Sequence, residues 1–251
     1  MSEAQFHTLP DGRRIAFRLT QGSGPALVFL PGYMSDMAGS KATALFDAAR
    51  DAGRTCLLLD YSGCGESPGD FAEGTLSRWQ EEVSALVGAL GLSSVILVGS
   101  SMGGWLMLLV ALELGERVQG LVGIAAAPDF TEWGYDSAQK AQLSAGHAVF
   151  EDNPYGPEPT PTHALFWQDG ERRKLLGGEI QLDCPGPVRL LHGQADPEVP
   201  FDISLKLAEC LRSADVQVTL IKDGDHRLSR PQDIALLLET ALGLTETAPC
   251  P

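Results

Sequence analysis

The sequence is poor in basic residues. Its 251 residues include 18 lysines and arginines against 33 aspartates and glutamates, so the formal net charge is -15 at pH 7. Such an acidic surface repels phosphate backbones and anionic lipid headgroups, which argues against a nucleic-acid or membrane-surface partner. The balance favours a protein that acts on small molecules, and nothing in the sequence indicates an obligate protein partner.

Long apolar runs and a cysteine framework are also missing. No apolar run approaches ~18 residues, and the first five residues lack the charged and apolar regions of a signal peptide. The cysteines are odd in number and show no metal-ligand spacing: Cys56, Cys64, Cys184, Cys210 and Cys250. This pattern argues against a disulfide framework. We therefore expect a cytoplasmic protein without a membrane span.

Short apolar runs recur along the chain, with helical patterns between them. The runs are Ala26 to Leu30, Thr55 to Leu59, Val95 to Val98, Leu121 to Ile124, Val188 to Leu191 and Val216 to Ile221. They are continuous rather than alternating, as in parallel strands that are covered on both faces. One helical stripe runs from Trp79 to Leu90 and ends at Gly91. The alternation predicts a single α/β domain over residues 1–251 with a mostly parallel, doubly wound sheet.

Two segments depart from this alternation, and the last helix has a recognisable start. A turn at Pro10-Asp11-Gly12 predicts an N-terminal antiparallel hairpin. Ser229 and Gln232 are spaced as a capping box for the last helix, with Pro231 in its first turn. Residues 128–184 contain proline, glycine and scattered aromatic residues. A structureless loop of that length would be unusual, so we expect this segment to form an inserted cap.

A glycine-flanked serine follows one of the predicted strands. Gly99-Ser100-Ser101-Met102-Gly103 stands between the run ending at Val98 and an apolar helical stretch from Trp105 to Leu114. This is the pattern G-x-S-x-G, whose turn is so tight that positions 99 and 103 must be nearly free of side chains. Ser101 is therefore the candidate nucleophile. The alternative is an exposed serine in a structural glycine turn.

A serine hydroxyl needs an adjacent base, and the sequence has five histidines. His7 falls in the hairpin, His147 and His163 fall in the expected cap, and His192 closes a strand, where packing beside the sheet is the ordinary expectation. His226 lies in the loop between the last strand and the last helix. That position favours His226 as the general base.

The carboxylate that orients the base is expected after the penultimate strand. Asp196 lies there, directly before Pro197, and completes the chain order Ser, Asp, His. A turn-forming role is the alternative for an aspartate before proline. Glu198 and Asp225 are weaker candidates for the same function.

Two backbone N–H groups are expected to bind the oxyanion of a tetrahedral intermediate. One belongs to Met102, directly after the nucleophile, and the other to Tyr33, after the glycine that lets the backbone bend toward the site. We expect Trp105, Phe166 and Trp167 to contact an acyl chain, because they offer apolar surface near the site.

No nucleotide, metal or cofactor site is indicated. The glycine-rich loop Asp60 to Ser67 lacks the lysine of a P-loop, and no G-x-G-x-x-G opens a helix there, so we interpret it as a scaffold loop. No cluster has zinc or iron spacing. We predict that the protein needs neither a metal ion nor a cofactor.

These motifs resemble those of the α/β-hydrolase superfamily. Four segments are similar to the mitochondrial palmitoyl-protein thioesterase subgroup and its bacterial relatives: Phe29 to Tyr33, Asp60 to Gly63, Gly99 to Trp105 and Asp225 to Arg227. The resemblance runs from about Phe29 to about Leu238 and implies S-depalmitoylase or acyl-glucuronide esterase activity. Superfamily members commonly carry His-Gly where this chain has Pro31-Gly32. No mitochondrial presequence precedes the domain, so we do not expect the mitochondrial location of the subgroup for this protein.

We therefore expect a serine hydrolase that cleaves acyl thioesters or carboxylic esters through a Ser-His-Asp triad and an acyl-enzyme. A general small-molecule carboxylesterase is the runner-up, and a ligand-binding receptor without turnover is an alternative of another class. The partner is expected to be a small-molecule or S-acylated substrate. Arg172, Arg173 and Lys174 form either an anion-binding patch on the cap or a solvated helix face.

Overall fold

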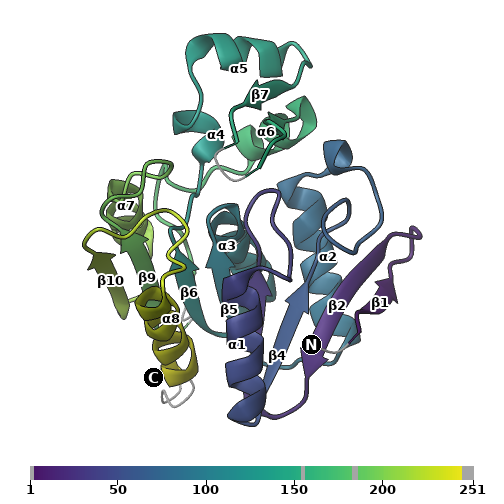
Figure 1. Ribbon diagram of the computed structural model, residues 1–251, viewed down its shortest axis with the longest axis vertical. Helices are drawn as coiled ribbons and strands as arrows, with labels where there is room; N and C mark the ends of the chain where they lie inside the picture. Colours follow the sequence, from purple (N-terminus) through teal and green to yellow (C-terminus); the bar gives the residue numbers. More distant parts are fainter. Residues whose placement is uncertain (1–2, 154–155, 183–185, 245–251) are drawn as a thin grey trace.

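The structure is a computed structural model that describes residues 3–153, 156–182 and 186–244. Its centre is an eight-stranded sheet with the order β1-β2-β4-β3-β5-β6-β9-β10 (Figure 1). The strands are β1 Gln5–Thr8, β2 Arg14–Thr20, β3 Ser23–Leu30, β4 Arg54–Leu59, β5 Val95–Ser100, β6 Val118–Ile124, β9 Val188–Gly193 and β10 Val216–Ile221. All six predicted apolar runs lie within these strands.

The sheet is parallel from β4 to β10, as the continuous apolar runs predicted. β1 and β2 form the expected antiparallel hairpin, and β2 also pairs antiparallel with β4. One expectation is wrong in detail: β10 is not buried on both faces, and its residues are exposed or half-buried throughout. The reason is its position at the edge of the sheet, where β9 is its single partner among the described strands.

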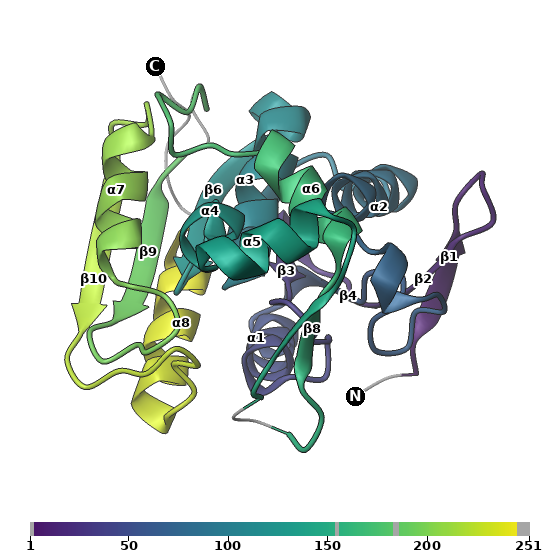
Figure 2. The ribbon, with the colours of Figure 1, turned by 90° about the horizontal axis from the view of Figure 1, so that it is seen from above.

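Helices cover both faces of the sheet (Figure 2). One apolar cluster joins a face to α1 Ser40–Asp51 and α8 Pro231–Gly243, and the other joins the opposite face to α2 Leu76–Ala89, α3 Met102–Leu114 and α7 Asp202–Cys210. Short 3-10 helices, η1 Phe71–Glu73 and η2 Gly115–Arg117, complete these layers. The predicted doubly wound α/β fold is therefore confirmed.

The start of α8 differs from the prediction. Pro231 lies in its first turn, as expected, but the residue before the helix is Arg230, not Ser229. The Asp233 carboxylate, not Gln232, accepts hydrogen bonds from the Arg230 backbone N–H at 3.2 Å and from its guanidinium at 2.8 and 2.9 Å. The helix therefore begins one residue later than predicted, with the Arg230 N–H and guanidinium both satisfied by the Asp233 carboxylate.

The segment predicted as a cap contains its own secondary structure. It holds α4 Phe130–Trp133, α5 Ser137–Ser144, β7 Val149–Glu151, β8 Thr160–Thr162 and α6 Ala164–Arg172, with β7 and β8 paired antiparallel. In Figure 1 these elements lie together at one end of the sheet, above α3. The expected cap ends at Cys184, which lies outside the described residues, as does Cys250.

Candidate active site

Ser101 lies at the turn between β5 and α3, with a φ of 55° and a ψ of -121°. A serine in this region of backbone space is strained, and the surrounding contacts must hold it there. A Cβ on Gly99 would lie 2.3 Å from the Gly103 carbonyl oxygen, and a Cβ on Gly103 would lie 2.1 Å from that of Leu30. Only glycine fits at both positions, as the sequence pattern predicted.

The structure brings Ser101, His226 and Asp196 together from three separate loops. His226 Nδ1 lies 2.8 Å from Asp196 Oδ2, and His226 Nε2 lies 3.0 Å from Ser101 Oγ. An ionised carboxylate can only accept, so Nδ1 carries the proton and donates it to Asp196. The unprotonated Nε2 is then left to accept the hydrogen bond of the Ser101 hydroxyl.

Asp196 is held from both of its carboxylate oxygens. Oδ1 accepts the backbone N–H groups of Glu198 at 2.8 Å and Val199 at 2.9 Å, while Oδ2 faces His226 and, at 3.3 Å, His192 Nε2. Burial alone would raise the pKa of this carboxyl, but the two imidazoles and the Val199 N–H lower it well below its usual range. Asp196 is therefore ionised throughout the neutral pH range.

The weaker candidates take other positions. Asp225 Oδ1 accepts the backbone N–H of Leu228 at 3.0 Å, which stabilises the turn after His226. Glu198 Oε2 lies 3.8 Å from His226 Nε2, on the side of the ring away from Asp196. Neither carboxylate replaces Asp196 at Nδ1.

The loops that carry Asp196 and His226 are joined by their backbones. Ala195 N–H donates to the Gly224 carbonyl at 2.9 Å. A Cβ on Gly193 would lie 2.2 Å from that same oxygen, so the two loops approach as closely as glycine allows. The separation of the two side chains is thus set by rigid backbone contacts at the end of β9.

The segment with the expected oxyanion donors lies against the serine turn. A Cβ on Gly32 would lie 3.3 Å from Ser101 Cβ, which shows how closely the two loops approach. Tyr61 Oη donates to the Pro31 carbonyl at 3.1 Å, and Tyr33 Oη donates to the Pro161 carbonyl at 3.0 Å. Both ends of the segment are therefore anchored. The donor role of the Tyr33 and Met102 N–H groups stays a prediction.

The loop 60–67 supports this segment through buried carboxylates. Asp60 Oδ1 accepts the Met37 N–H at 2.7 Å and Oδ2 accepts the Glu66 N–H at 2.8 Å. Glu82 on α2 is fully buried and accepts from the Ser62 N–H at 2.9 Å and the Ser62 hydroxyl at 2.6 Å.

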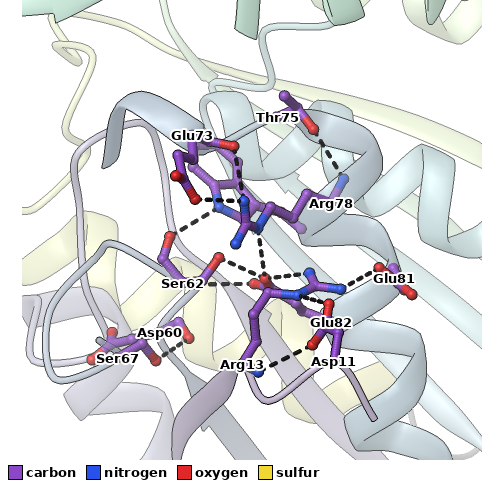
Figure 3. A network of polar contacts seen from close by, with 11 residues as sticks. Asp11, Arg13, Asp60, Ser62, Ser67, Glu73, Thr75, Arg78, Glu81 and Glu82 are labelled. Atoms are coloured by element: carbon purple, nitrogen blue, oxygen red, sulfur yellow. Dashed lines mark hydrogen bonds and ion pairs between the residues drawn. The ribbon is translucent and has the colours of Figure 1, made fainter. Parts of the chain in front are cut away.

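Arg13 from the β1–β2 hairpin reaches the same carboxylate. Its guanidinium lies 2.8 Å from Glu82 Oε1 and also contacts Asp11 and Glu81 (Figure 3). The buried charge of Glu82 is therefore paired. The network supports the interpretation of the loop as scaffold, and the long-range contact from residue 13 to residue 82 could not be read from any motif.

Of the predicted substrate-binding aromatic residues, Trp105 lies on α3, and Phe166 and Trp167 lie on α6 in the segment above it. Trp105 and Phe166 are buried in an aromatic cluster, in which Phe130 lies 5.8 Å from Trp105 and 5.6 Å from Phe166 between ring centroids. Tyr33 joins the cluster at 4.7 Å from Phe166. Trp167 is half-buried and donates its indole N–H to the Thr131 carbonyl at 3.1 Å. Their contact with substrate stays a prediction.

A cavity of about 290 Å³ lies beside the Tyr33 segment. Its lining consists of residues 34–36, 63–65 and 70–72, with Pro161 and His163. Sequence reasoning interpreted residues 63–65 as part of a scaffold loop and did not connect them with the other lining residues, which come from three further segments of the chain. Ser35 links the cavity to the serine turn: a Cβ on Gly32 would lie 3.6 Å from Ser35 Oγ and 3.3 Å from Ser101 Cβ.

The three consecutive basic residues at the end of α6 have acidic or polar partners. Arg172 lies 3.8 Å from Asp169, Lys174 lies 3.1 Å from Glu171, and Arg173 donates to the Gln80 side chain. These contacts favour the solvated-face interpretation over an anion site. Over the described ranges, no group of three or more His, Cys, Asp or Glu side chains is arranged to hold a metal ion.

The chain is similar to known proteins in sequence and in fold. Residues 25–169 match the family described as the alpha/beta hydrolase fold. The chain belongs to the α/β-hydrolase fold family, and it is a hydrolase enzyme, as the sequence predicted.

Within the family, the chain is similar to a palmitoyl-protein thioesterase. It is 35% identical to human mitochondrial palmitoyl-protein thioesterase ABHD10 over 244 residues, which are 94% of this chain and 78% of the relative. The structure of mouse alpha/beta hydrolase domain-containing protein 10 matches with a TM-score of 0.88 and 34% identity, over 97% of this chain and 98% of that one. The crystal structure described as a putative hydrolase from Agrobacterium vitis S4 matches with a TM-score of 0.89 and 38% identity, over 98% of this chain and 100% of that one.

Proposed function

We propose that the protein is a serine hydrolase that cleaves acyl thioesters, with carboxylic esters as the runner-up substrate class. The observation that carries the proposal is the pair of hydrogen bonds that connects Asp196 through His226 to Ser101, whose backbone is strained. The similarity to relatives named palmitoyl-protein thioesterase supports the choice of thioesters.

In the proposed mechanism, Ser101 Oγ attacks the acyl carbonyl carbon while His226 Nε2 takes the hydroxyl proton. Asp196 holds the ring in the tautomer that leaves Nε2 free and stabilises the imidazolium that forms. The Tyr33 and Met102 N–H groups bind the developing oxyanion. His226 then gives its proton to the departing thiol or alcohol, and water attacks the acyl-enzyme with His226 again as the base.

Part of the substrate is proposed to occupy the cavity of residues 34–36, 63–65 and 70–72, because its lining residue Ser35 lies beside Gly32, which packs against Ser101. The acyl chain is proposed to contact Trp105, Phe166 and Trp167. Trp105 and Phe166 are covered in this structure, so such contact requires the segment above α3 to shift.

The test of the nucleophile is covalent labelling. We expect a fluorophosphonate probe to label the wild-type protein, and Ser101→Ala to lose both labelling and hydrolysis of a p-nitrophenyl ester. Loss of one triad member removes nearly all activation, because the members act as a unit. Ser100→Ala is the matched control, since Ser100 is the adjacent, buried serine. Full labelling of Ser101→Ala at another serine would contradict the assignment.

A cytoplasmic location is also part of the proposal. The described part of the chain contains no helix that is long and apolar enough to cross a membrane. The similar thioesterases carry a mitochondrial designation in their names, which makes the organelle the alternative. Fractionation of cells that express the protein with its native N-terminus would separate the two.

A further inference from the structure

His192 lies near the end of β9, next to Asp196 of the candidate triad. Its side chain is fully buried, and its Nε2 lies 3.0 Å from the Val199 carbonyl oxygen and 3.3 Å from Asp196 Oδ2. Both of these oxygens can only accept, so the proton of the neutral ring must lie on Nε2. Nδ1 then accepts the Ser204 hydroxyl at 2.7 Å. The ring is thus fixed in one tautomer from both sides.

This arrangement connects Asp196 to the rigid sheet by two routes. The N–H of His192 donates to the Val199 carbonyl, and the Val199 N–H in turn donates to Asp196 Oδ1. The same imidazole N–H places its positive end toward Asp196 Oδ2, the oxygen that accepts from His226. Asp196 otherwise lies on a loop, and a loop carboxylate needs such support to keep one orientation.

We infer that His192 is a positioning residue that orients Asp196, and through Asp196 the base His226, for the hydrolysis proposed above. The inference rests on the proposed function only for its effect on rate. Its effect on the Asp196–His226 hydrogen bond is independent of what the protein hydrolyses. A buried imidazole N–H needs one acceptor, which the Val199 carbonyl already supplies, so packing alone does not account for the approach of Nε2 to Asp196 Oδ2 at 3.3 Å.

The chain offers variants that separate positioning from packing. In His192→Gln the side-chain amide reaches as far as Nε2 and keeps a donor there. In His192→Asn it reaches only as far as Nδ1, so the contact with Ser204 can remain while the donor toward Val199 and Asp196 is lost. Ser204→Ala is the matched control, because it disturbs the same buried site but leaves the two acceptors that hold the proton on Nε2.

We expect His192→Asn to lower kcat about tenfold, the loss expected for one hydrogen bond, with KM within twofold of wild type. The downfield proton resonance of His226 Nδ1–H should move, because Asp196 Oδ2 loses a competing donor. For the same reason, the acid limb of the pH profile of kcat/KM should move to higher pH. Glu198, whose carboxylate lies 3.8 Å from His226 Nε2, is unchanged in every variant, as are the neighbouring charges of Asp225 and Arg227. His192→Gln should stay within threefold of wild type. Ser204→Ala should lower the melting temperature but leave kcat, the resonance and the pH profile unchanged.

Folded His192→Asn with wild-type kcat and resonance would overturn the inference, and so would equal losses in His192→Gln and Ser204→Ala. If His192→Asn does not fold, nitrogen chemical shifts of labelled histidine in the wild-type protein still decide: His192 must be neutral with its proton on Nε2, and a proton on Nδ1 contradicts the inference. Failure of the wild-type protein to hydrolyse esters or react with the fluorophosphonate would instead overturn the proposed function, while the resonance measurements would still test His192.

Discussion

Replacing Gly103 with alanine tests whether the serine turn and the Tyr33 segment are held by close backbone packing. Gly103 is the second residue of α3 and lies beside the end of β3. A Cβ at this position would lie 2.1 Å from the Leu30 carbonyl oxygen and 2.4 Å from that of Pro31. Both neighbours are backbone atoms, so no side-chain rotation can relieve the contact.

The expected size of the effect follows from these distances. A carbon and an oxygen atom need more than 3 Å in ordinary contact, so one backbone must move by roughly 1 Å. Overpacking of a buried site costs about 1–3 kcal/mol, and two backbone contacts place Gly103→Ala at about 3 kcal/mol. For a chain of this size that lowers the melting temperature by roughly 6–12 °C. Because the displaced segment carries the proposed oxyanion donor, a shift of about 1 Å should also reduce kcat by about 10²-fold.

Thermal unfolding and ester hydrolysis measure the two effects, and Gly88→Ala is the control. Gly88 lies in α2, is exposed, and has no atom within 4 Å of a Cβ. Alanine in a helix is about 0.5–1 kcal/mol more favourable than glycine, so Gly88→Ala should raise the melting temperature slightly without a change in kcat. Wild-type stability and kcat in Gly103→Ala would refute the reasoning from backbone contact.

Three further predictions follow from other parts of the molecule. Trp167→Ala should move the acyl chain-length optimum for a series of esters, because each buried methylene is worth ~0.8 kcal/mol, and an unchanged profile would place the acyl site elsewhere. Burial lowers the pKa of Lys41 from 10.5 to about 8, so between these values the unfolded chain holds a proton that the folded chain has released. The free energy of unfolding should therefore rise with pH across that window relative to Lys41→Met, and equal slopes in urea titrations would contradict this. An S-acyl peptide should be hydrolysed with a higher kcat/KM than the matching coenzyme A thioester, with a gap that narrows at high salt; a coenzyme A preference that disappears in Arg172→Ala plus Arg173→Ala would reverse the conclusion.

The elements that the sequence predicted are those whose cause is local. Continuous apolar runs produce strands buried on both faces, and a tight turn requires glycine at positions 99 and 103, so both could be read directly. His226 and Asp196 could be selected because topology restricts where a base and its carboxylate reach the end of a parallel sheet. The predicted burial of β10 and the predicted start of α8 were wrong. β10 is exposed because no described strand pairs with its outer edge, which the apolar run itself does not reveal. α8 begins after Arg230 because Asp233, three residues on, accepts from both the backbone N–H and the guanidinium of Arg230.

By itself the sequence determined the fold class, the serine turn and the residues that could form a triad, because each depends on residue type and spacing along the chain. Only the tertiary structure decided what holds those residues in place. The contacts of Arg13 with Glu82 and of Asp60 with Met37 join segments whose patterns show no relation to each other. The physical reason is that a buried charge or imidazole takes whichever partner the packed chain brings to it, and that partner is fixed by three-dimensional proximity rather than by sequence separation.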